Sequence, residues 1–406
     1  MFGNDARRPA FRLIAAASAA TALLCGLTGP AVAAPVGPVL GTGVEGAIPG
    51  SYIVVLKSGT DTAAGVADTS RELVREYGGT VAGEYHATVR GFHLNATAAQ
   101  ARRLAADPGV AFVEQDAEIS TAAEPITQSG PTWGLDRIDQ PALPLSGSYT
   151  HRSAAGVTAY VIDTGVKIGH REFGGRAVDG WDFVDNDAVA DDCHGHGTHV
   201  AGTIGGATYG VAKDVGLVAL KVLGCDGSGS FAGFIAAVDW VTANAKRPAV
   251  ANMSLGGSLS TSLNAAVQRS IAQGVTYVLA AGNANRNACE VSPAATPEAI
   301  TVGATDSADT RASFSNYGPC LDVFAPGVRI ASAGTASDWD VKLLSGTSMA
   351  APHVAGAAAL ILGAHPDRSP AQVRDDLVAG AGVDLVGNPG DGSPNRLLHT
   401  GHLNTV

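Results

Sequence analysis

Apolar and polar residues follow one pattern before about residue 117 and a different pattern after residue 133. The first part carries short alternating stretches, typical of half-buried strands, and two charged helical stretches that end at Gly-Gly or Asp-Pro-Gly. We predict strands at residues 52–56, 80–94 (a hairpin) and 110–114, and helices at 69–77 and 98–106. This order of elements predicts a small open sheet with two helices on one face.

From residue 133 onward, continuous apolar runs of strand length alternate with helical stretches. The predicted strands are 157–162, 215–223, 250–255, 275–280, 300–304 and 321–324, and the predicted helices are 197–204, 231–246, 262–273, 348–362 and 370–379. Continuously apolar strands separated by helices indicate a mostly parallel sheet covered on both faces, which is a three-layer α/β/α domain. In such sheets, functional sites form at the carboxyl ends of the strands.

The N-terminus has the pattern of a secretory signal peptide. Arg7, Arg8 and Arg12 precede an apolar run at 13–27, and small residues at 31–34 offer cleavage sites. A membrane anchor is the alternative, but the apolar run is short and is followed by small residues that are typical of a signal-peptide cleavage site. We therefore predict an extracellular protein whose mature form has no membrane segment. The apolar stretch after Ser348 contains Pro and Gly residues, and we predict that it is a core helix.

Composition supplies the domain boundaries. A stretch rich in Gly, Pro and Val follows the signal peptide, and a polar stretch without periodicity, exposed and cleavable, separates the two patterned regions. The predicted organisation is a signal peptide at 1–34, a linker at 35–50, a small α+β domain at 51–118, a cleavable linker at 119–130 and an α/β domain at 131–406. The net charge of −11, with no basic block, argues against nucleic acid as a partner.

Four cysteines remain after removal of the signal peptide, which carries Cys25. An even number of thiols in an exported protein predicts two disulfides. Pairing in sequence order, Cys193 with Cys225 and Cys289 with Cys320, would close loops of similar length (225 − 193 = 32 and 320 − 289 = 31). The sequence alone leaves three pairings open, with a metal site as a minor alternative.

Three residues at predicted element ends have the chemistry of nucleophilic acyl transfer. Asp163 ends a strand, His196 opens a helix, and Ser348 opens another helix after a Gly-Thr turn. A serine is a poor nucleophile until a neutral imidazole takes its proton. The imidazole in turn needs a carboxylate that fixes its tautomer and stabilises its cation.

Each of these residues also has a plainer interpretation. Ser348 could be only a helix-capping residue, and Asp163 could be only a turn residue. His194, His196 and His199 have a spacing that resembles metal ligands, which would make a metal-dependent hydrolase. No acidic partner stands nearby in the pattern of zinc proteases, so the acid, histidine and serine together are the stronger interpretation.

Three long motifs carry a family resemblance: VIDTG at 161–165, HGTHVAGT at 196–203 and GTSMAAPHVAG at 346–356. In this order they closely resemble the subtilisin-like serine proteases, and among them the secreted proteinase K-type branch. The resemblance extends from Trp133 to the C-terminus, and the unit at 51–116 resembles the inhibitory propeptide of the same family.

The resemblance implies a subtilisin-like three-layer fold preceded by a small ferredoxin-like propeptide domain. It also implies a secreted, monomeric serine endopeptidase that is made as a self-processing zymogen. Its partners would be protein and peptide substrates, together with its own propeptide as intramolecular inhibitor. Cleavage would fall between about residues 119 and 128. A catalytically inactive relative that only binds peptides is the alternative.

The resemblance assigns a role to each matching residue. Asp163 orients, His196 is the general base and then the acid, and Ser348 attacks. Asn283, which follows a predicted strand end, stands where the family has its oxyanion-hole amide and would act with the backbone N–H of Ser348. Without the resemblance, a turn residue would be the preferred interpretation of Asn283.

The segment 252–257 resembles the family's substrate-binding segment, to which an extended peptide would add as a strand. The expected substrate-binding residues are Ser254, Leu255, Gly256, Gly227, Gly229, Ala280, Ala281 and Gly282. The residues expected to line the main pocket are small and uncharged. We therefore predict a preference for apolar or aromatic side chains at P1, the position before the cut bond.

The resemblance also implies structural Ca²⁺ and no catalytic cofactor. One expected site uses Asp322 with the carbonyls of Pro297 and Ala299. A second would use Asp136, Asp139, Gln140, Ser146 and Ser148, and a weaker third cluster is Asp182, Asp185 and Asp187. Oxygen ligands suit Ca²⁺. Solvated surface charge is the alternative for the acidic residues of the second set.

Overall fold

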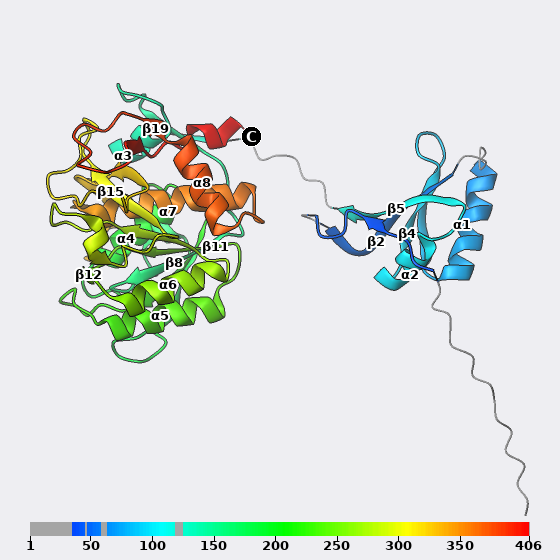
Figure 1. The fold of residues 1–406 in the computed structure, drawn as a ribbon, viewed down its shortest axis with the longest axis horizontal. Helices are drawn as coiled ribbons and strands as arrows, with labels where there is room; N and C mark the ends of the chain where they lie inside the picture. The colour runs from blue at the N-terminus through cyan, green and yellow to red at the C-terminus, as the bar shows by residue number, and fades with distance from the viewer. Residues whose placement is uncertain (1–34, 45–46, 58–62, 118–124, 406) are drawn as a thin grey trace, which may run out of the picture. The chain divides into compact units, whose positions relative to one another are not determined.

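The computed structural model describes residues 35–44, 47–57, 63–117 and 125–405. The predicted signal peptide and the first part of the predicted cleavable linker lie outside these residues. The chain divides into two compact units, Met1–Ser120 and Thr121–Val406, each of which is described by itself (Figure 1).

The N-terminal unit is a five-stranded sheet with two helices. Its strands lie in the order β1 (Val39–Leu40), β5 (Val110–Ala117), β2 (Ala47–Leu56), β4 (Gly91–Asn95) and β3 (Thr80–Tyr85), and its helices are α1 (Ala63–Tyr77) and α2 (Ala98–Leu104). Leu73 of α1, Leu104 of α2 and Phe92 of β4 belong to one buried cluster, so both helices cover the same face of the sheet, as predicted. The α2 helix begins with a reciprocal capping box between Thr97 and Gln100.

Three features of this unit differ from the prediction. Strand β2 begins at Ala47, five residues before the predicted start at residue 52. The α1 helix begins at Ala63, six residues before the predicted start at residue 69. Strand β1 forms inside the predicted linker at 35–50 and pairs in parallel with β5, Val39 against Val113. A two-residue strand is too short to show a periodic pattern in the sequence. Its pairing uses backbone N–H and C=O groups, which every residue type except proline carries in full.

The C-terminal unit is built on one nine-stranded sheet. The strand order is β19 (Gly382–Val383), β20 (Arg396–Leu397), β16 (Val323–Pro326), β15 (Ile300–Thr305), β13 (Thr276–Ala280), β11 (Ala249–Met253), β8 (Thr158–Asp163), β10 (Gly216–Lys221) and β9 (Ala177–Asp182). Neighbouring strands are parallel except for the antiparallel edge pair of β19 and β20. The short edge strands were not predicted, since they lack a continuous apolar run.

Helices cover both faces of this sheet, which confirms the three-layer α/β/α prediction (Figure 1). The helices are α4 (His196–Gly205), α5 (Phe231–Asn244), α6 (Thr261–Ala272), α7 (Thr347–Ala364) and α8 (Pro370–Gly380). Ala159 and Val161 of β8 pack in the cluster of α4 and α7, whereas Tyr160 and Ile162 pack in the cluster of α5 and α6. Because successive side chains point to opposite covered faces, all four positions are apolar.

Shorter elements connect this frame. They are β6 (Ile126–Ser129), α3 (Trp133–Ile138), β7 (Ser148–His151), β12 (Gly257–Ser258), β14 (Val291–Ser292), β17 (Ile330–Ala333), β18 (Val341–Leu344) and the 3₁₀ turns Arg171–Phe173, Ala288–Glu290 and Gly401–Thr405. Strand β6 falls inside the predicted cleavable linker at 119–130 and pairs with β7.

Helix α7 is long and apolar enough, by length and composition, to cross a membrane. In the fold, 83% of this 18-residue stretch is buried inside the protein. It is therefore the core helix that the sequence predicted.

The two disulfides join Cys193 to Cys225 and Cys289 to Cys320, which selects the pairing in sequence order from the three that were open. The first ties the segment before α4 to the loop after β10. That loop carries Gly227 and approaches the carboxyl end of the sheet, so the cross-link holds together two segments next to the candidate site.

Candidate active site

The carboxyl end of β8 places a buried carboxylate against the start of α4. Asp163 has no exposed side-chain surface, and its Oδ1 lies 2.7 Å from Nδ1 of His196. The same oxygen accepts the backbone N–H of Thr164 at 2.7 Å. A Cβ at Gly197 would collide with the carbonyl of Gly165, so glycine at this position lets α4 approach β8 closely enough for the contact.

This contact determines the protonation of His196. A carboxylate can only accept a hydrogen bond, so Nδ1 carries the proton and Nε2 of the neutral ring is the basic nitrogen. Burial lowers the pKa of His196, but the charge and hydrogen bond of Asp163, with the charge of Asp192, outweigh it and raise the pKa above its ordinary value of 6.5. The imidazolium that forms when His196 takes a proton is therefore stabilised.

A second buried carboxylate, Asp192, organises the turn before α4 and was not predicted from the sequence. Its Oδ2 accepts the hydroxyl of Thr198 at 2.6 Å, and its Oδ1 accepts the hydroxyl of Thr164 at 2.8 Å. It also accepts the backbone N–H groups of His194 and Gly195. An acid just before a helix N-terminus was the available signal, because it complements the helix dipole.

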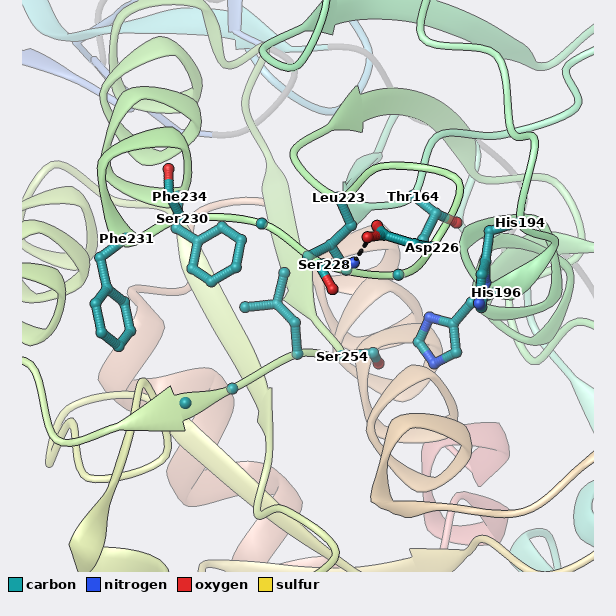
Figure 2. Close-up of a pocket in the computed structure, with 15 residues that line it drawn as sticks. Thr164, His194, His196, Leu223, Asp226, Ser228, Ser230, Phe231, Phe234 and Ser254 are labelled. Carbon is teal, nitrogen blue, oxygen red and sulfur yellow. Dashed lines mark hydrogen bonds between the residues drawn. The ribbon is translucent and has the colours of Figure 1, made fainter.

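Ser348 lies in the first turn of α7 and is fixed against the segment after β11. Pro352 has no N–H, so it cannot bond the carbonyl of Ser348 four residues earlier. That carbonyl instead accepts the hydroxyl of Ser254 at 2.9 Å, while the Ser348 hydroxyl donates to the Ser254 carbonyl at 3.1 Å. Ser254 lines the same cavity as His196, which brings the segment bonded to Ser348 and the imidazole to one cleft (Figure 2).

Asn283 has its side-chain amide oriented by α7. Its Oδ1 accepts the backbone N–H of Thr347 at 2.8 Å and the hydroxyl of Thr347 at 3.0 Å. Because a backbone N–H can only donate, the oxygen of the amide must face Thr347, and the NH₂ group points away from it. Asn283 and Ser348 line one cavity of about 200 Å³. Thr347 was missed as a positioning residue, since its partner lies 64 residues away.

Two cavities meet along the segment that was predicted to bind substrate. The larger, of about 790 Å³, runs from His194 and His196 to Phe231 and Phe234 (Figure 2). Leu255 and Gly256 line both cavities. Of the predicted substrate-binding residues, Ser254, Gly227 and Gly229 line the larger cavity, and Ala280 and Gly282 line the smaller one.

One predicted substrate residue lies elsewhere. Ala281 is fully buried and packs with Ala288 and Phe324 rather than lining either cavity. Two charged lining residues, Asp226 in the larger cavity and Arg286 in the smaller, were not predicted, because they stand in irregular loops.

The histidine cluster does not have the arrangement of a metal site. His199 is fully buried, and its Nε2 donates to the carbonyls of Ile330 at 2.9 Å and Lys342 at 3.2 Å. Burial lowers the pKa of His199 to about 4, so it is a neutral structural donor. Within residues 35–405, excluding the gaps in the described ranges, no three His, Cys, Asp or Glu side chains stand together as metal ligands would.

The second expected calcium set lies together around the loop before β7. Asp136 Oδ1 accepts the backbone N–H of Ser146 at 2.9 Å, and Gln140 Oε1 accepts the same N–H at 2.7 Å. The hydroxyl of Ser146 lies 3.0 Å from that of Ser148.

Asp139 is the member of this set that lacks a full set of partners. Its Oδ2 accepts the backbone N–H of Thr150 at 2.8 Å, while its buried Oδ1 has no hydrogen-bond partner among the described residues. Burial raises the pKa of Asp139 to about 6, and the charge of Asp136 adds to the effect. An orphaned carboxylate oxygen beside a second carboxylate fits a cation.

The other two expected sets do not fit as well. Asp182 Oδ1 accepts the backbone N–H groups of Val184 and Asp185, which is turn capping. At Asp322, burial raises the pKa to about 6, against the lowering effects of the Thr301 amide and the Arg374 charge. At this set the guanidinium of Arg374 already supplies a positive charge next to the Asp322 carboxylate.

Comparison with known proteins gives two matches along the chain. Residues 154–401 match the family described as the subtilase family, and residues 51–122 match peptidase inhibitor I9. The "Extracellular serine proteinase" of Thermus sp. (strain Rt41A) is 49% identical over 395 residues, covering 93% of this chain and 95% of that protein.

Two further matches are also to proteins named as serine proteases. The "Alkaline serine exoprotease A" of Vibrio alginolyticus is 54% identical over 319 residues, which is 77% of this chain, and the match spans 59% of that protein's length. A solved structure, "Crystal structure of a cold adapted subtilisin-like serine proteinase", is similar with a TM-score of 0.66 and 55% identity, covering 67% of this chain and 99% of that chain.

Proposed function

This chain belongs to the subtilase family of serine peptidases, and from that premise we propose that Asp163, His196 and Ser348 form its catalytic triad. The protein is a secreted serine endopeptidase that is made with an inhibitor-type propeptide. The observation that carries the proposal is the 2.7 Å contact between a fully buried carboxylate and Nδ1 of an imidazole in the substrate-sized cleft.

The proposed mechanism follows from the protonation of this pair. Nε2 of His196 takes the proton of the Ser348 hydroxyl as the oxygen attacks the scissile carbonyl. Asp163 stabilises the imidazolium that results. His196 then gives the proton to the leaving amine, and water releases the acyl group from Ser348 by the same steps.

Two donors would stabilise the oxyanion of the tetrahedral intermediate. The backbone N–H of Ser348 belongs to the first turn of α7, where N–H groups have no intrahelical partner. The NH₂ group of Asn283 is turned away from Thr347 and lines the same cavity as Ser348. Such fixed dipoles stabilise developing negative charge without reorganising during the reaction.

Substitution of Asn283 by Ala is expected to lower kcat by about 100- to 1000-fold, a magnitude known from subtilisin itself. The change should appear mainly in kcat, because the oxyanion forms only in the transition state. Steady-state kinetics on a chromogenic peptide test this. Substitution of Thr347 by Val, which leaves the amide in place but removes one bond to it, should give a smaller loss. An effect of Asn283→Ala confined to KM would contradict the assignment.

The preference at P1 is proposed to be apolar or aromatic. Ala280 and Gly282 line the smaller cavity with Ser348, and Arg286 adds a positive charge there. We expect kcat/KM for Phe and Leu at P1 to exceed that for Lys and Arg, as measured on a substrate series that varies only at P1.

The variant Arg286→Glu should raise the ratio of Lys to Phe activity by about 3- to 10-fold, a range expected for a reversed charge near the surface. Arg269→Glu, an exposed site on α6, is the matched control and should leave the ratio unchanged. A wild-type enzyme that cuts best after Lys or Arg would refute the preference.

The precursor is proposed to process itself, with the propeptide as its intramolecular inhibitor. The proposed domains are those predicted above, with two adjustments at their edges. Strand β1 extends the propeptide domain toward Val39, and β6 extends the peptidase domain toward Ile126. Because a paired strand resists cleavage, the cut should fall before Ile126.

Calcium is proposed as a structural ion at the loop from Asp136 to Ser148, with no cofactor for catalysis. The buried Oδ1 of Asp139 and the neighbouring carboxylate of Asp136 support this site. A bound Ca²⁺ would supply the missing partner and offset the repulsion between the two carboxylates. The mature enzyme is proposed to act as a monomer on protein and peptide substrates.

A further inference from the structure

The oxygen groups expected to hold Ca²⁺ at Asp322 are bonded by a side chain of this protein. Arg374, on α8, donates from Nη1 to the carbonyl of Pro297 at 2.6 Å. Its Nε lies 3.4 Å from Oδ1 of Asp322. The other carboxylate oxygen accepts the backbone N–H of Thr301 at 2.8 Å. One guanidinium therefore bridges two of the three expected calcium ligands.

The position of this guanidinium is set by the helix that carries it. A reciprocal capping box between Ser369 and Gln372 fixes where α8 begins. Val373 and Leu377 of α8 are fully buried, which fixes the rotation of the helix on the protein. Arg374 follows Val373 directly and therefore emerges at the edge of the packed face, beside Asp322 and Pro297.

This arrangement conflicts with a divalent cation at the same place. Ca²⁺ requires six to eight oxygen ligands at about 2.3–2.6 Å, and a guanidinium nitrogen now occupies the ligand side of the Pro297 carbonyl. Two cations bridging the same carboxylate would also repel each other. An arginine keeps its charge at any ordinary pH, so it does not leave by deprotonation.

The conflict could be relieved only by moving Arg374 away. Its side chain is 34% exposed, and it lines an open cavity of about 360 Å³ together with Asp322, Asp375 and Arg396. Movement into solvent is therefore sterically possible. It would cost the bond to Pro297 and the pairing with Asp322.

We propose that the Arg374 guanidinium is the cation of this site in place of a divalent metal ion. It cross-links the Pro297 carbonyl and the Asp322 carboxylate, so the site needs no calcium. It joins α8 to the segment before β15 and to the start of β16, which are 77 and 52 residues away (374 − 297 and 374 − 322). The inference does not depend on the catalytic assignments, because it concerns a structural site.

The test compares calcium binding and thermal stability in wild type and in Arg374→Gln. Both proteins are used as secreted and processed, then inactivated with a serine reagent to prevent self-digestion. Equilibrium dialysis against Ca²⁺ should show one more bound ion per molecule in Arg374→Gln than in wild type. In chelator, the Tm of the variant should be about 2–6 °C lower, and added Ca²⁺ should restore most of that loss.

Controls separate this site from the others. Arg368→Gln removes a comparable surface cation, which pairs with Asp376 at 3.3 Å, and should change neither the calcium stoichiometry nor its effect on Tm. Asp322→Asn placed on Arg374→Gln should abolish the gained ion. Asp322→Asn alone should leave the wild-type stoichiometry unchanged.

Two results would overturn the proposal. A wild-type protein that loses one bound Ca²⁺ on Asp322→Asn already binds calcium here, and Arg374 is then not the cation of this site. An Arg374→Gln protein that binds no additional ion would show that this is not an exchangeable cation site. If Arg374→Gln is not secreted, Arg374→Lys replaces it. A lysine keeps the charge but not the bridging geometry, so it should give a smaller calcium response in the same direction.

Discussion

Replacing Ser348 by Ala is expected to lower kcat by about 10⁶-fold, the magnitude known for removal of the nucleophile in subtilisin itself. No other group can take the place of the hydroxyl, because His196 then has no hydroxyl to deprotonate and no side-chain oxygen is left at residue 348 to attack the carbonyl. The residual rate would come from oxyanion stabilisation and binding alone. Hydrolysis of a peptide substrate by the purified variant measures the loss.

The same substitution should also stop maturation. If the precursor cuts itself, Ser348→Ala should accumulate as a full-length precursor with its propeptide still attached, as seen by mass spectrometry. Ser345→Ala, an exposed serine three residues earlier whose hydroxyl accepts the N–H of Arg329, is the matched control and should mature normally. Normal processing of Ser348→Ala would refute self-cleavage, and normal turnover would refute the nucleophile.

Replacing Asp163 by Asn is expected to lower kcat/KM by about 10⁴-fold. The amide can donate to Nδ1, which selects the wrong tautomer of His196 and leaves no charge to stabilise the imidazolium. Mature variant can be prepared by adding a trace of wild-type enzyme to the precursor. Steady-state kinetics from pH 5 to pH 9 measure both the loss and its pH dependence.

The pH profile distinguishes this role from a structural one. His196 must be neutral to act as base, and its pKa is raised above 6.5, so wild-type kcat/KM should fall as pH drops through that raised pKa. Without the charge of Asp163, burial dominates and the pKa falls, so the acid limb of Asp163→Asn should move to lower pH.

Asp182→Asn is the control for Asp163→Asn. It is another buried carboxylate at a strand end, but its Oδ1 accepts backbone N–H groups instead of facing an imidazole. It should leave the acid limb in place. An Asp163→Asn profile with an unshifted acid limb would contradict the pairing with His196.

Most of the frame follows from patterns that are local in the sequence. The six inner strands of the main sheet, from β16 to β10 in the sheet order, were predicted to within a few residues. A strand covered on both faces must be apolar, as in residues 159–162 of β8, whereas the edge strands β9, β19 and β20 lack a continuous apolar run and were not predicted. The helices α5, α6, α7 and α8 were equally clear, because a helical stretch is a pattern of consecutive residues. Strands β1 and β6 were not, since they are too short to show a periodic pattern.

The candidate site was predicted in part for the same reason. Asp163, His196 and Ser348 stand at element ends, where parallel topology brings side chains to one edge of the sheet. Asp192, Thr347 and Arg286 were missed. Asp192 carried one local signal, its place just before a helix N-terminus, and the other two carried none. The importance of each depends on what the fold places opposite it.

By itself, the sequence determined the two-part organisation, the layered fold and the chemical types available at the strand ends, because burial and backbone geometry act over a few neighbouring residues. The tertiary structure alone decided the disulfide pairing, the orientation of the Asn283 amide by Thr347, and the contact of Arg374 with Pro297 across 77 residues. Hydrogen bonds and charges act over a few ångströms in space, whatever the distance along the chain, so these partners become known only once the chain is folded.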